Sequence, residues 1–326
     1  MFANKEILIT GGTGTWGQEF ARQLLKKDAA SIIIFSRNEA AQVLMKQQFN
    51  DERLHFIIGD IRDAGAISEA CIGVDYVIHT AALKHVIKCE EQPREATKTN
   101  ITGVQNVIQA CIDNSVQMCV NISSDKVCDA NCFYGKTKAV GEGLFTEANN
   151  MTNRTDFISV RSGNILGSSG SVVPLWIKQI KENNQIRLTD TRMKRFFILV
   201  EDAARYTFEA MEHCERGEVY VFRMPAFYVS DLADIIVKKY GNDKTIIEKI
   251  GLMPGERLIE WLVTDEEALR CLCYDHFYVI YPLIKIQGTN YPKITGQYKL
   301  QKGYCMNDSD EHKYEELKDL LERAGH

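Results

Sequence analysis

The stretch from Asn121 to Lys138, "NISSDKVCDANCFYGKTK", concentrates side chains that can move protons. Tyr134 and Lys138 stand four residues apart at the start of a predicted helix, so they share one face of it. An ammonium group beside a phenol favours the phenolate and lowers its pKa, which makes the tyrosine usable as a general base. A Y-x-x-x-K pair alone is common by chance, so its setting in the chain decides its weight.

The residues ahead of this pair offer more than an alcohol oxidation requires. Ser123, Ser124, Asp125 and Lys126 directly follow an apolar run. Oxidation of an alcohol by hydride transfer uses a hydroxyl beside the tyrosine, but neither an acid nor an amine. An elimination uses both, one group to protonate a leaving hydroxyl and one to remove a carbon-bound proton. The alternative is that Asp125 and Lys126 form an exposed loop ion pair, which would contribute little.

A glycine-rich turn, "TGGTGTWG", lies between the first predicted strand and the first predicted helix. Such a turn brings the backbone and the first helical amides close to a pyrophosphate. Glycine triplets also serve plain turns, but the position at the start of a βαβ unit favours dinucleotide binding. The predicted contacts are Gly11, Thr13, Gly14, Thr15, Trp16 and Gly17.

The end of the second predicted strand distinguishes the two nicotinamide dinucleotides. A NAD site usually has Asp or Glu there, whereas this chain has Ser36, Arg37 and Asn38, which suit a 2′-phosphate. We therefore predict NADP; in the alternative, Arg37 is solvated and Glu39 folds back onto the ribose. Asp60 and Ile61, at the end of the third predicted strand, are expected at the adenine, although Asp60 could instead cap a helix.

Short apolar runs alternate with helical patterns through the first half of the chain, which predicts a parallel sheet buried on both faces. The expected strands are 6–10, 31–36, 54–60, 74–80, 117–123 and 156–163. From about Asn164 longer loops separate smaller elements, which predicts a C-terminal lobe over one end of the sheet. Further helices are expected over 200–213, 229–240, 266–272 and the tail, where Asp308 or Asp310 is a candidate N-cap.

Composition excludes several classes of protein. The chain has 326 residues, 45% hydrophobic and 25% charged, and a net charge of -5 without basic blocks, so no nucleic-acid partner is expected. It shows neither a signal-peptide pattern nor about 18 consecutive apolar residues, so no membrane association is expected. Its ten cysteines lack zinc-site spacing, Cys271 and Cys273 included. We therefore predict that the protein binds no metal and that its cysteines are free thiols in the cytoplasm.

These features together resemble the extended short-chain dehydrogenase/reductase superfamily. The resemblance implies a Rossmann-type doubly wound parallel sheet, with residues 1–163 binding NADP, part of 196–225 returning to that domain, and 164–326 mainly binding substrate. It implies that Tyr134 takes a proton from a sugar hydroxyl while Lys138 binds the nicotinamide ribose and tunes Tyr134. It also adds predicted cofactor contacts at Ala81, Ala82, Lys84, Asn100, Tyr134 and Lys138.

Longer motifs narrow the resemblance to the flagellar and capsular 4,6-dehydratases acting on UDP-N-acetylglucosamine. These motifs are "SSDKV", "TAALKHV", "VRSGNILGSSGSVVP", "TRMKRFFI", "VSDLADII" and "GLMPGERLIE". That family carries Thr-Asp-Lys where this chain has Ser124, Asp125 and Lys126. The resemblance implies that Tyr134 initiates C4 oxidation, Lys126 removes the C5 proton, Asp125 protonates the leaving C6 hydroxyl, and hydride returns to C6. It leaves the C5 configuration open.

The same motifs predict the residues on the substrate side. They are Lys84, His85, Asn164, Ser171, Val172, Arg195 and Glu256. His85 could instead contact the residues that bind the sugar and not the sugar itself, and Arg195 could be a surface arginine. Two positions depart from the family, which often has an aromatic residue at Ser162 and an arginine at Met253. The second departure leaves the diphosphate contacts and the nucleotide base open.

Two other functions compete with dehydration of a UDP-sugar. One is a UDP-sugar 4-epimerase or reductase with the same cofactor, and it would not need Asp125 or Lys126. The other is a non-catalytic dinucleotide sensor, which would need none of the four residues Asp125, Lys126, Tyr134 and Lys138 for catalysis. The resemblance further implies a homo-oligomer, often a hexamer, and a pathway such as pseudaminic acid biosynthesis for flagellin glycosylation.

Overall fold

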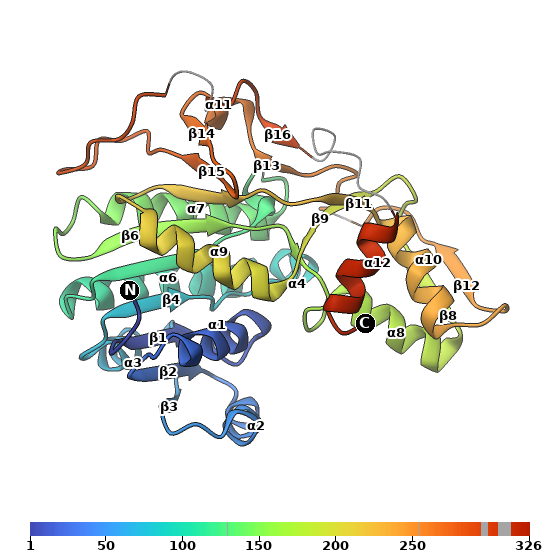
Figure 1. The fold of residues 1–326 in the computed structure, drawn as a ribbon, viewed down its shortest axis with the longest axis horizontal. Coiled ribbons are helices and arrows are strands. Elements are labelled where there is room, and N and C mark those ends of the chain that lie inside the picture. Colours follow the sequence, from blue (N-terminus) through green and yellow to red (C-terminus); the bar gives the residue numbers. More distant parts are fainter. Residues whose placement is uncertain (129, 254, 295–298, 306–313) are drawn as a thin grey trace.

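The computed structural model describes residues 1–326 apart from 129, 254, 295–298 and 306–313. Its central strands are β1 (Glu6–Thr10), β2 (Ser31–Ser36), β3 (Leu54–Ile58), β4 (Tyr76–His79), β5 (Met118–Ile122), β6 (Asp156–Arg161), β10 (Val219–Phe222), β14 (Cys271–Cys273) and β15 (Phe277–Ile280). Within the described residues they form one nine-stranded sheet in the order β14-β15-β10-β6-β5-β4-β1-β2-β3 (Figure 1).

The strand order reverses beside β1, from which the chain first builds outward to β3 and then outward to β6. Pairings from β3 to β10 are parallel, and β15 and β14 run antiparallel to their neighbours. This arrangement is the doubly wound Rossmann-type sheet, so the predicted fold class is confirmed. A crevice is expected outside the carboxyl ends of β1 and β4, where the order reverses.

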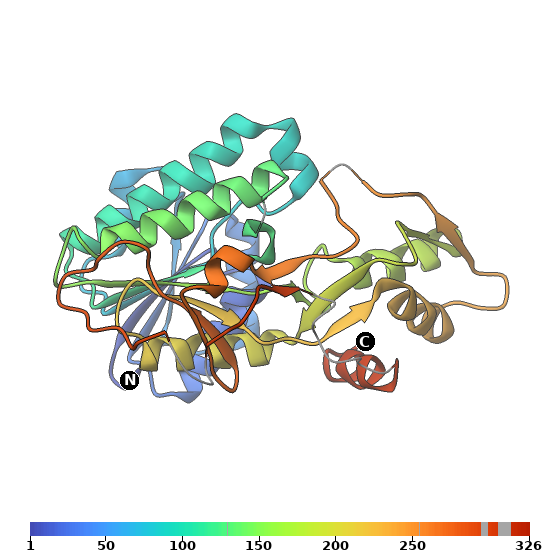
Figure 2. The ribbon, with the colours of Figure 1, turned by 90° about the horizontal axis from the view of Figure 1, so that it is seen from above.

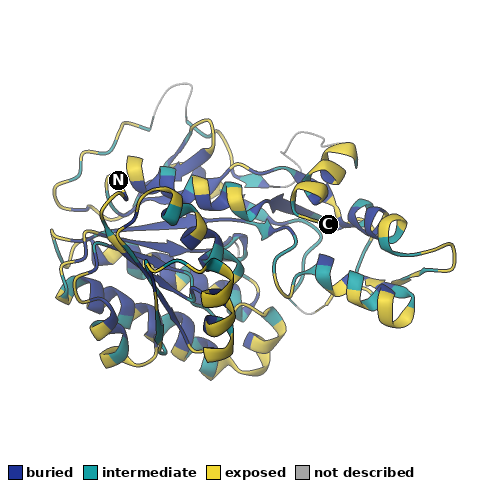
Figure 3. Ribbon diagram, turned by 60° about the horizontal axis from the view of Figure 1, so that its bottom comes forward, coloured by how far each residue is buried: buried dark blue, intermediate teal, exposed yellow. Residues whose placement is uncertain are grey.

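Helices cover both faces of the sheet, which explains why its strands are apolar runs without alternation. One face carries α1 (Thr15–Lys26) and α9 (Val200–His213), and the other carries α3 (Ala64–Ala70), α6 (Gly103–Asp113) and α7 (Phe133–Ala148) (Figure 2). Burial is concentrated in the strands and the inner sides of these helices (Figure 3). The remaining helices of this part are α2 (Glu39–Phe49), α4 (Val86–Glu91), α5 (Pro93–Thr97), the π-helix η1 (Lys98–Thr102) and the 3-10 helix η2 (Asp125–Val127).

A smaller group of elements has its own core beside one end of the sheet (Figure 1). It comprises β7 (Asn164–Ile165), α8 (Val172–Asn183), β8 (Gln185–Leu188), β9 (Lys194–Ile198), β11 (Ala226–Tyr228), α10 (Val229–Tyr240), β12 (Ile246–Lys249) and α12 (Tyr314–Arg323). Trp176, Ile236 and Leu321 are buried in that core. The chain crosses back to the large sheet at β10 and again at β14 and β15.

Several boundaries differ from those expected. The helix predicted over 266–272 is only α11 (Asp265–Ala268), because Cys271–Cys273 pairs with β15. A short antiparallel pair, β13 (Trp261–Val263) and β16 (Tyr304–Cys305), lies nearby. The candidate N-caps Asp308 and Asp310 lie outside the described residues. In the described part of the chain no helix is long and apolar enough to cross a membrane, and all ten cysteines are free thiols.

A buried ion cluster joins the returning segment to the sheet. Arg161, at the end of β6, is 1% exposed, and its Nη2 is 2.8 Å from carboxylate oxygens of both Glu142 and Glu267. Its Nη1 donates to the carbonyl oxygen of Leu262 at 2.7 Å. The cluster therefore fixes the segment 262–267 against β6 and α7.

We expect Arg161→Met to lower the free energy of unfolding by about 3–5 kcal/mol, because two carboxylates would be left buried without their cation. The control is Arg192→Met, which removes the exposed Arg192–Asp190 pair and should cost about 0–1 kcal/mol. Urea unfolding of both variants measures the difference. Equal midpoints for the two variants would show that the cluster does not hold the segment.

Candidate active site

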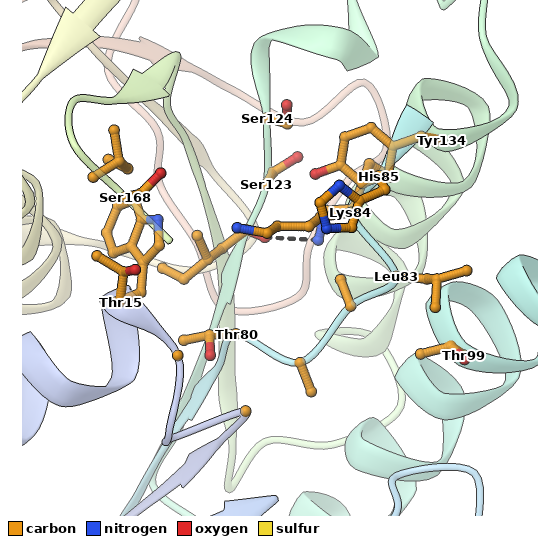
Figure 4. A pocket seen from close by; sticks show the side chains of 18 of the residues that line it. Thr15, Thr80, Leu83, Lys84, His85, Thr99, Ser123, Ser124, Tyr134 and Ser168 are labelled. Carbon is orange, nitrogen blue, oxygen red and sulfur yellow. Dashed lines mark hydrogen bonds between the residues drawn. The ribbon is translucent and has the colours of Figure 1, made fainter. Parts of the chain in front are cut away.

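The expected crevice is a cavity of about 730 Å³ at the carboxyl ends of β1, β2, β4 and β5. It brings together residues from the glycine turn, the β2 and β3 ends, the loop after β4 and the catalytic stretch (Figure 4). The predicted residues that line it are Gly11, Thr13, Gly14, Thr15, Trp16, Ser36, Arg37, Asn38, Asp60, Ile61, Ala81, Ala82, Lys84, His85, Ser124, Asp125, Lys126, Tyr134, Lys138 and Asn164.

The glycine turn has the geometry that a pyrophosphate requires. Gly11 has a φ of +67°, and a Cβ added to Gly17 would lie 2.4 Å from the backbone of Gly12. Gly17 is therefore needed for close packing of helix on strand rather than for lining the cavity. Gly14 is the N-cap of α1 without any side-chain cap, which leaves the first amides of the helix for an anion. The turn fits a dinucleotide.

The other end of the cavity presents positive charge. Arg37 lies at its edge, with Nη1 3.7 Å from Asp60 Oδ2, and its side chain is 54% exposed. The Asn38 side chain instead caps α2 by accepting from the Ala41 amide. Glu39 stands exposed in the first turn of α2, outside the set of described residues that line the cavity. This end of the cavity therefore presents the guanidinium of Arg37 beside the carboxylate of Asp60.

Asn100 lies behind the cavity wall rather than on it. Its amide nitrogen donates to the carbonyl oxygen of Leu83 at 3.0 Å and to Thr137 Oγ1 at 3.0 Å. Its Oδ1 accepts from the Leu83 amide at 2.8 Å. Asn100 therefore fixes the loop that carries Lys84 and His85 against α7, and in this structure it contacts the site through that loop.

Tyr134 directs its hydroxyl towards the serines that follow β5 (Figure 4). Burial raises its pKa to about 12, and a hydrogen bond with Ser124 opposes that shift. The pKa of Tyr134 therefore lies above its ordinary value, because burial outweighs the lowering effects of Ser124 and Lys126. Lys138 Nζ donates to the carbonyl oxygen of Ile122 at 2.6 Å, and burial lowers its own pKa to about 8. Both side chains nevertheless line the same cavity.

Asp125 and Lys126 are not an exposed loop pair, so that alternative is wrong. Asp125 is 4% exposed, and both of its oxygens lie 3.1 Å from Lys126 Nζ. Lys126 Nζ also lies 2.5 Å from Glu260 Oε1, and Glu260 is 5% exposed. The side chain of Ser124 donates to Asp125 Oδ1 at 3.0 Å. Two buried carboxyl groups therefore hold one ammonium group, whose side chain is 21% exposed at the wall of the cavity.

The charges of this group influence one another strongly. Burial opposes the charge of Lys126, but the carboxylates of Asp125 and Glu260 hold its pKa above the ordinary value. Burial likewise opposes the charge of Asp125, and the ammonium of Lys126 holds that pKa below the ordinary value. Burial, with the charge of Asp125, raises the pKa of Glu260 to about 7. The resting site therefore favours a carboxylate at Asp125 and an ammonium at Lys126.

A second cavity of about 410 Å³ lies in the smaller lobe and shares Asn164 and Ile165 with the first. The predicted substrate residues Ser171, Val172, Arg195 and Glu256 line it. Arg187 and Met253 line it too, and Met253 stands where the resemblance leads one to expect an arginine. The cavity therefore has two cationic side chains, Arg187 and Arg195. The first cavity suits a dinucleotide and a sugar, and the second suits the rest of a nucleotide.

One loop connects the two lobes above the glycine turn. The Ser169 amide donates to Thr15 Oγ1 at 3.2 Å, and the Ser169 carbonyl accepts from Lys84 Nζ at 3.0 Å. Ser168 and Thr15 line the same side of the cavity (Figure 4). A ligand on the glycine turn would therefore lie beneath this loop.

Comparison with known proteins identifies the family. The family described as "Polysaccharide biosynthesis protein" matches residues 7–282. The chain belongs to this polysaccharide biosynthesis family. The predicted resemblance to extended short-chain dehydrogenases of the UDP-N-acetylglucosamine 4,6-dehydratase type is thereby confirmed.

Relatives within the polysaccharide biosynthesis family span the whole chain. A Campylobacter jejuni protein named "UDP-N-acetylglucosamine 4,6-dehydratase (inverting)" is 37% identical, covering 100% of this chain and 99% of that protein. A Rickettsia bellii protein named "UDP-glucose 4-epimerase" is also 37% identical, covering 98% of this chain and 96% of that protein.

Solved structures agree with the described fold. The X-ray structure of Pen from Bacillus thuringiensis aligns with a TM-score of 0.91 at 36% identity, covering 99% of this chain and 98% of that chain. The dTDP-glucose 4,6-dehydratase DesIV from Streptomyces venezuelae, solved with NAD bound, aligns with a TM-score of 0.71 at 25% identity, covering 78% and 86%. Since its relatives bind nicotinamide dinucleotides on this fold, a nicotinamide cofactor is supported for this member of the family.

The structure adds site residues that sequence reasoning about this family member missed. Glu260 lies at Lys126 and ends the motif "GLMPGERLIE", from which only Glu256 was predicted as a site residue. Arg187 lines the second cavity and lies outside the quoted motifs. Ser123 has a buried hydroxyl with no hydrogen-bond partner among the described residues, and it lines the first cavity. Its place beside Ser124 was the one available signal.

Proposed function

We propose that this protein is an NADP-dependent UDP-N-acetylglucosamine 4,6-dehydratase that forms a UDP-2-acetamido-2,6-dideoxy-4-keto-hexose. The observation that carries the proposal is the buried Asp125–Lys126 pair beside Tyr134, at a cavity whose other end fits a dinucleotide. Relatives with this name and this chain length support it. On this proposal, residues 1–163 mainly bind the cofactor and 164–326 mainly bind the UDP-sugar.

Tyr134 and its neighbours carry out the first proton transfer. Tyr134 accepts the proton of the C4 hydroxyl, and Ser124 orients the phenol through their hydrogen bond. Lys138, poised near pH 8 by its burial, would hold the nicotinamide ribose. When bound, the nicotinamide supplies the hydride chemistry, accepting hydride from C4 and returning it to C6. Lys84 and His85, at the same cavity, would contact the sugar.

Asp125 and Lys126 carry out the elimination. A keto group at C4 makes the C5 proton acidic, and Lys126 is placed to remove it while Asp125 protonates the departing C6 hydroxyl. Burial of Asp125 strengthens its electrostatic interactions with Lys126 and with the bound sugar. The buried hydroxyl of Ser123, which has no hydrogen-bond partner among the residues that the structure describes, would donate to an oxygen of the bound sugar or cofactor.

The second cavity would hold the UDP part of the substrate. Arg187 and Arg195 provide cations for the diphosphate, and the uncapped N-terminus of α8 at Ser171 and Val172 provides amide donors. Glu256 is placed for the uridine ribose. Asn164 lines both cavities and would lie where sugar and diphosphate join.

Arg37 should determine the preference for NADP over NAD. We expect Arg37→Ala to weaken NADP⁺ binding about 10-fold or more, because a charge-assisted contact to the 2′-phosphate is worth about 1.5–3 kcal/mol. NAD⁺ binding should change little. Titration calorimetry with both dinucleotides measures this, and the exposed Arg94→Ala is the control. If Arg37→Ala weakened binding of NADP⁺ and NAD⁺ equally, Arg37 would not be the residue that contacts the 2′-phosphate.

NMR of the purified protein with UDP-N-acetylglucosamine in deuterated buffer tests the proposed function. Dehydration yields a new C6 methyl group, a 4-keto group and deuterium at C5, and the product coupling constants report the C5 configuration. The relative's name "inverting" makes inversion the expected outcome. An intact C6 hydroxymethyl group in every product would refute the dehydratase assignment.

The second candidate is a UDP-sugar 4-epimerase or reductase. It is favoured by relatives named UDP-glucose 4-epimerase at the same identity as the dehydratase relative. In the NMR experiment, an epimerase would give C4 inversion without loss of the C6 hydroxyl. The buried Asp125–Lys126 pair argues for elimination because epimerisation gives these two groups no task.

The wider setting follows from the proposed reaction and the resemblance. The product suits a pathway to a deoxyamino sugar such as pseudaminic acid for flagellin glycosylation, in the cytoplasm, and the protein is proposed to act as a homo-oligomer, with the hexamer as the expected form. Light scattering tests the assembly.

A further inference from the structure

Lys126 is held by two buried carboxyl groups, and the second has no part in the reaction as described above. Lys126 Nζ is 2.5 Å from Glu260 Oε1 and 3.1 Å from each oxygen of Asp125. Glu260 immediately precedes β13, which packs against η2, the helix of Asp125 and Lys126. The two carboxyl groups also hydrogen-bond to each other. The side chains of Asp125, Lys126 and Glu260 are therefore close enough to exchange protons with one another.

The resting charges of these side chains are the reverse of those that the elimination needs. A base at C5 must be a neutral amine, and an acid at C6 must carry a proton. The resting site instead favours ammonium at Lys126 and carboxylate at Asp125. A proton must therefore move from the amine to the carboxyl groups before C5 is deprotonated.

We propose that Glu260 shares one proton with Asp125, and that this carboxyl pair accepts a second proton from Lys126 when the elimination begins. The transfer leaves a neutral amine at Lys126 and a protonated carboxyl at Asp125. The amine then takes the C5 proton, and the C–H electron pair forms the C5=C6 double bond. Asp125 gives its proton to the C6 oxygen as the C–O bond breaks and water leaves. Lys126 ends as ammonium and the pair again holds one proton.

Two buried carboxyl groups in contact share a proton because they cannot both ionise easily at this distance from each other. The charged groups that face Glu260 are Asp125 and Lys126 from η2 and Arg195 from β9, whose Nε is 3.4 Å from Glu260 Oε1. Burial and Asp125 together outweigh the two cations and raise the pKa of Glu260 to about 7. Glu260 acts through Lys126 and not on the sugar, so it is a positioning residue.

The test compares Glu260→Gln and Glu260→Asp with the wild-type protein across pH, with cofactor bound and UDP-N-acetylglucosamine added. Absorbance of the reduced nicotinamide reports C4 oxidation, and NMR reports deuterium at C5 and the C6 methyl group. Above about pH 7 the wild-type elimination rate should fall, because loss of the shared proton leaves two carboxylates that hold Lys126 as ammonium. Glu260→Gln should eliminate about 100-fold more slowly, oxidise C4 normally and lack this fall near pH 7. Glu260→Asp should again show the fall in elimination rate near pH 7.

Three results would overturn the inference. The first is a Glu260→Gln variant with the wild-type elimination rate and pH profile. The second is loss of C4 oxidation in parallel with elimination in both variants, which would make Glu260 purely structural. If Glu260→Gln does not fold, the third is a folded Glu260→Asp variant whose elimination rate does not fall near pH 7. Because the inference rests on the proposed function, a wild-type protein that forms no C6 methyl group refutes both, whereas the three results above refute only this inference.

Discussion

Lys126→Ala is expected to stop the reaction after oxidation at C4. The variant lacks the group placed to remove the C5 proton, so formation of the C6 methyl group should fall by at least about 100-fold. The C4 hydroxyl still meets Tyr134, so reduced nicotinamide and a 4-keto sugar should accumulate in a single turnover. Stopped-flow absorbance and NMR of the quenched mixture measure the two steps separately.

Two controls isolate the chemical role of Lys126. Lys136→Ala removes an exposed lysine from the same region of α7 and should leave turnover unchanged. Removing Lys126 also leaves Asp125 and Glu260 buried without their shared cation, which should destabilise the fold by about 3–5 kcal/mol. Thermal unfolding therefore confirms that the variant is folded at the assay temperature. Normal turnover by a folded Lys126→Ala variant would contradict the assignment of the loop.

Tyr134→Phe is expected to abolish the reaction one step earlier. The substitution keeps the ring and removes the hydroxyl that accepts the C4 proton, so C4 oxidation should slow by about 10³-fold, or about 4 kcal/mol in the barrier. No reduced nicotinamide should appear after substrate is added. Because elimination requires the 4-keto group, deuterium should not enter C5 either.

A matched tyrosine separates this effect from a general effect of losing a phenol. Tyr228 lies 45% exposed in β11, with its ring near Lys194, and Tyr228→Phe should react normally. Calorimetry should find unchanged dinucleotide binding to Tyr134→Phe, since the glycine turn is untouched. C4 oxidation at the normal rate in Tyr134→Phe would show that another group is the base.

Local pattern was sufficient to predict the sheet and the glycine turn. Buried parallel strands are short apolar runs, and a turn that contacts a phosphate needs glycines at fixed spacing. Both features therefore depend only on residues that are close together in the sequence. The segment 266–272 was predicted incorrectly because pairing between Cys271–Cys273 and β15 outweighed the helical pattern of "EEALRCL". That pairing depends on residues that only the folded sheet brings together.

The proposed catalytic group was partly predictable for the same reason. Asp125, Lys126, Tyr134 and Lys138 lie in one short stretch, and their types indicate their chemistry. Glu260 comes from a distant segment that returns to the sheet, and single-sequence reasoning offers no signal for its contact with Lys126. The raised pKa of Tyr134 was missed because burial, which the sequence does not reveal, dominates it.

The loop at Ser169 has a consequence for how the protein uses its dinucleotide. The loop belongs to the smaller lobe and hydrogen-bonds to both Lys84 and Thr15 at the wall of the first cavity, so it joins the two lobes beside the glycine turn. The proposed reaction returns its hydride to the same sugar and leaves the dinucleotide in its original oxidation state. Release between turnovers would therefore serve no purpose. The dinucleotide would act as a resident prosthetic group, and the rate in the cell would be independent of the ratio of oxidised to reduced pools.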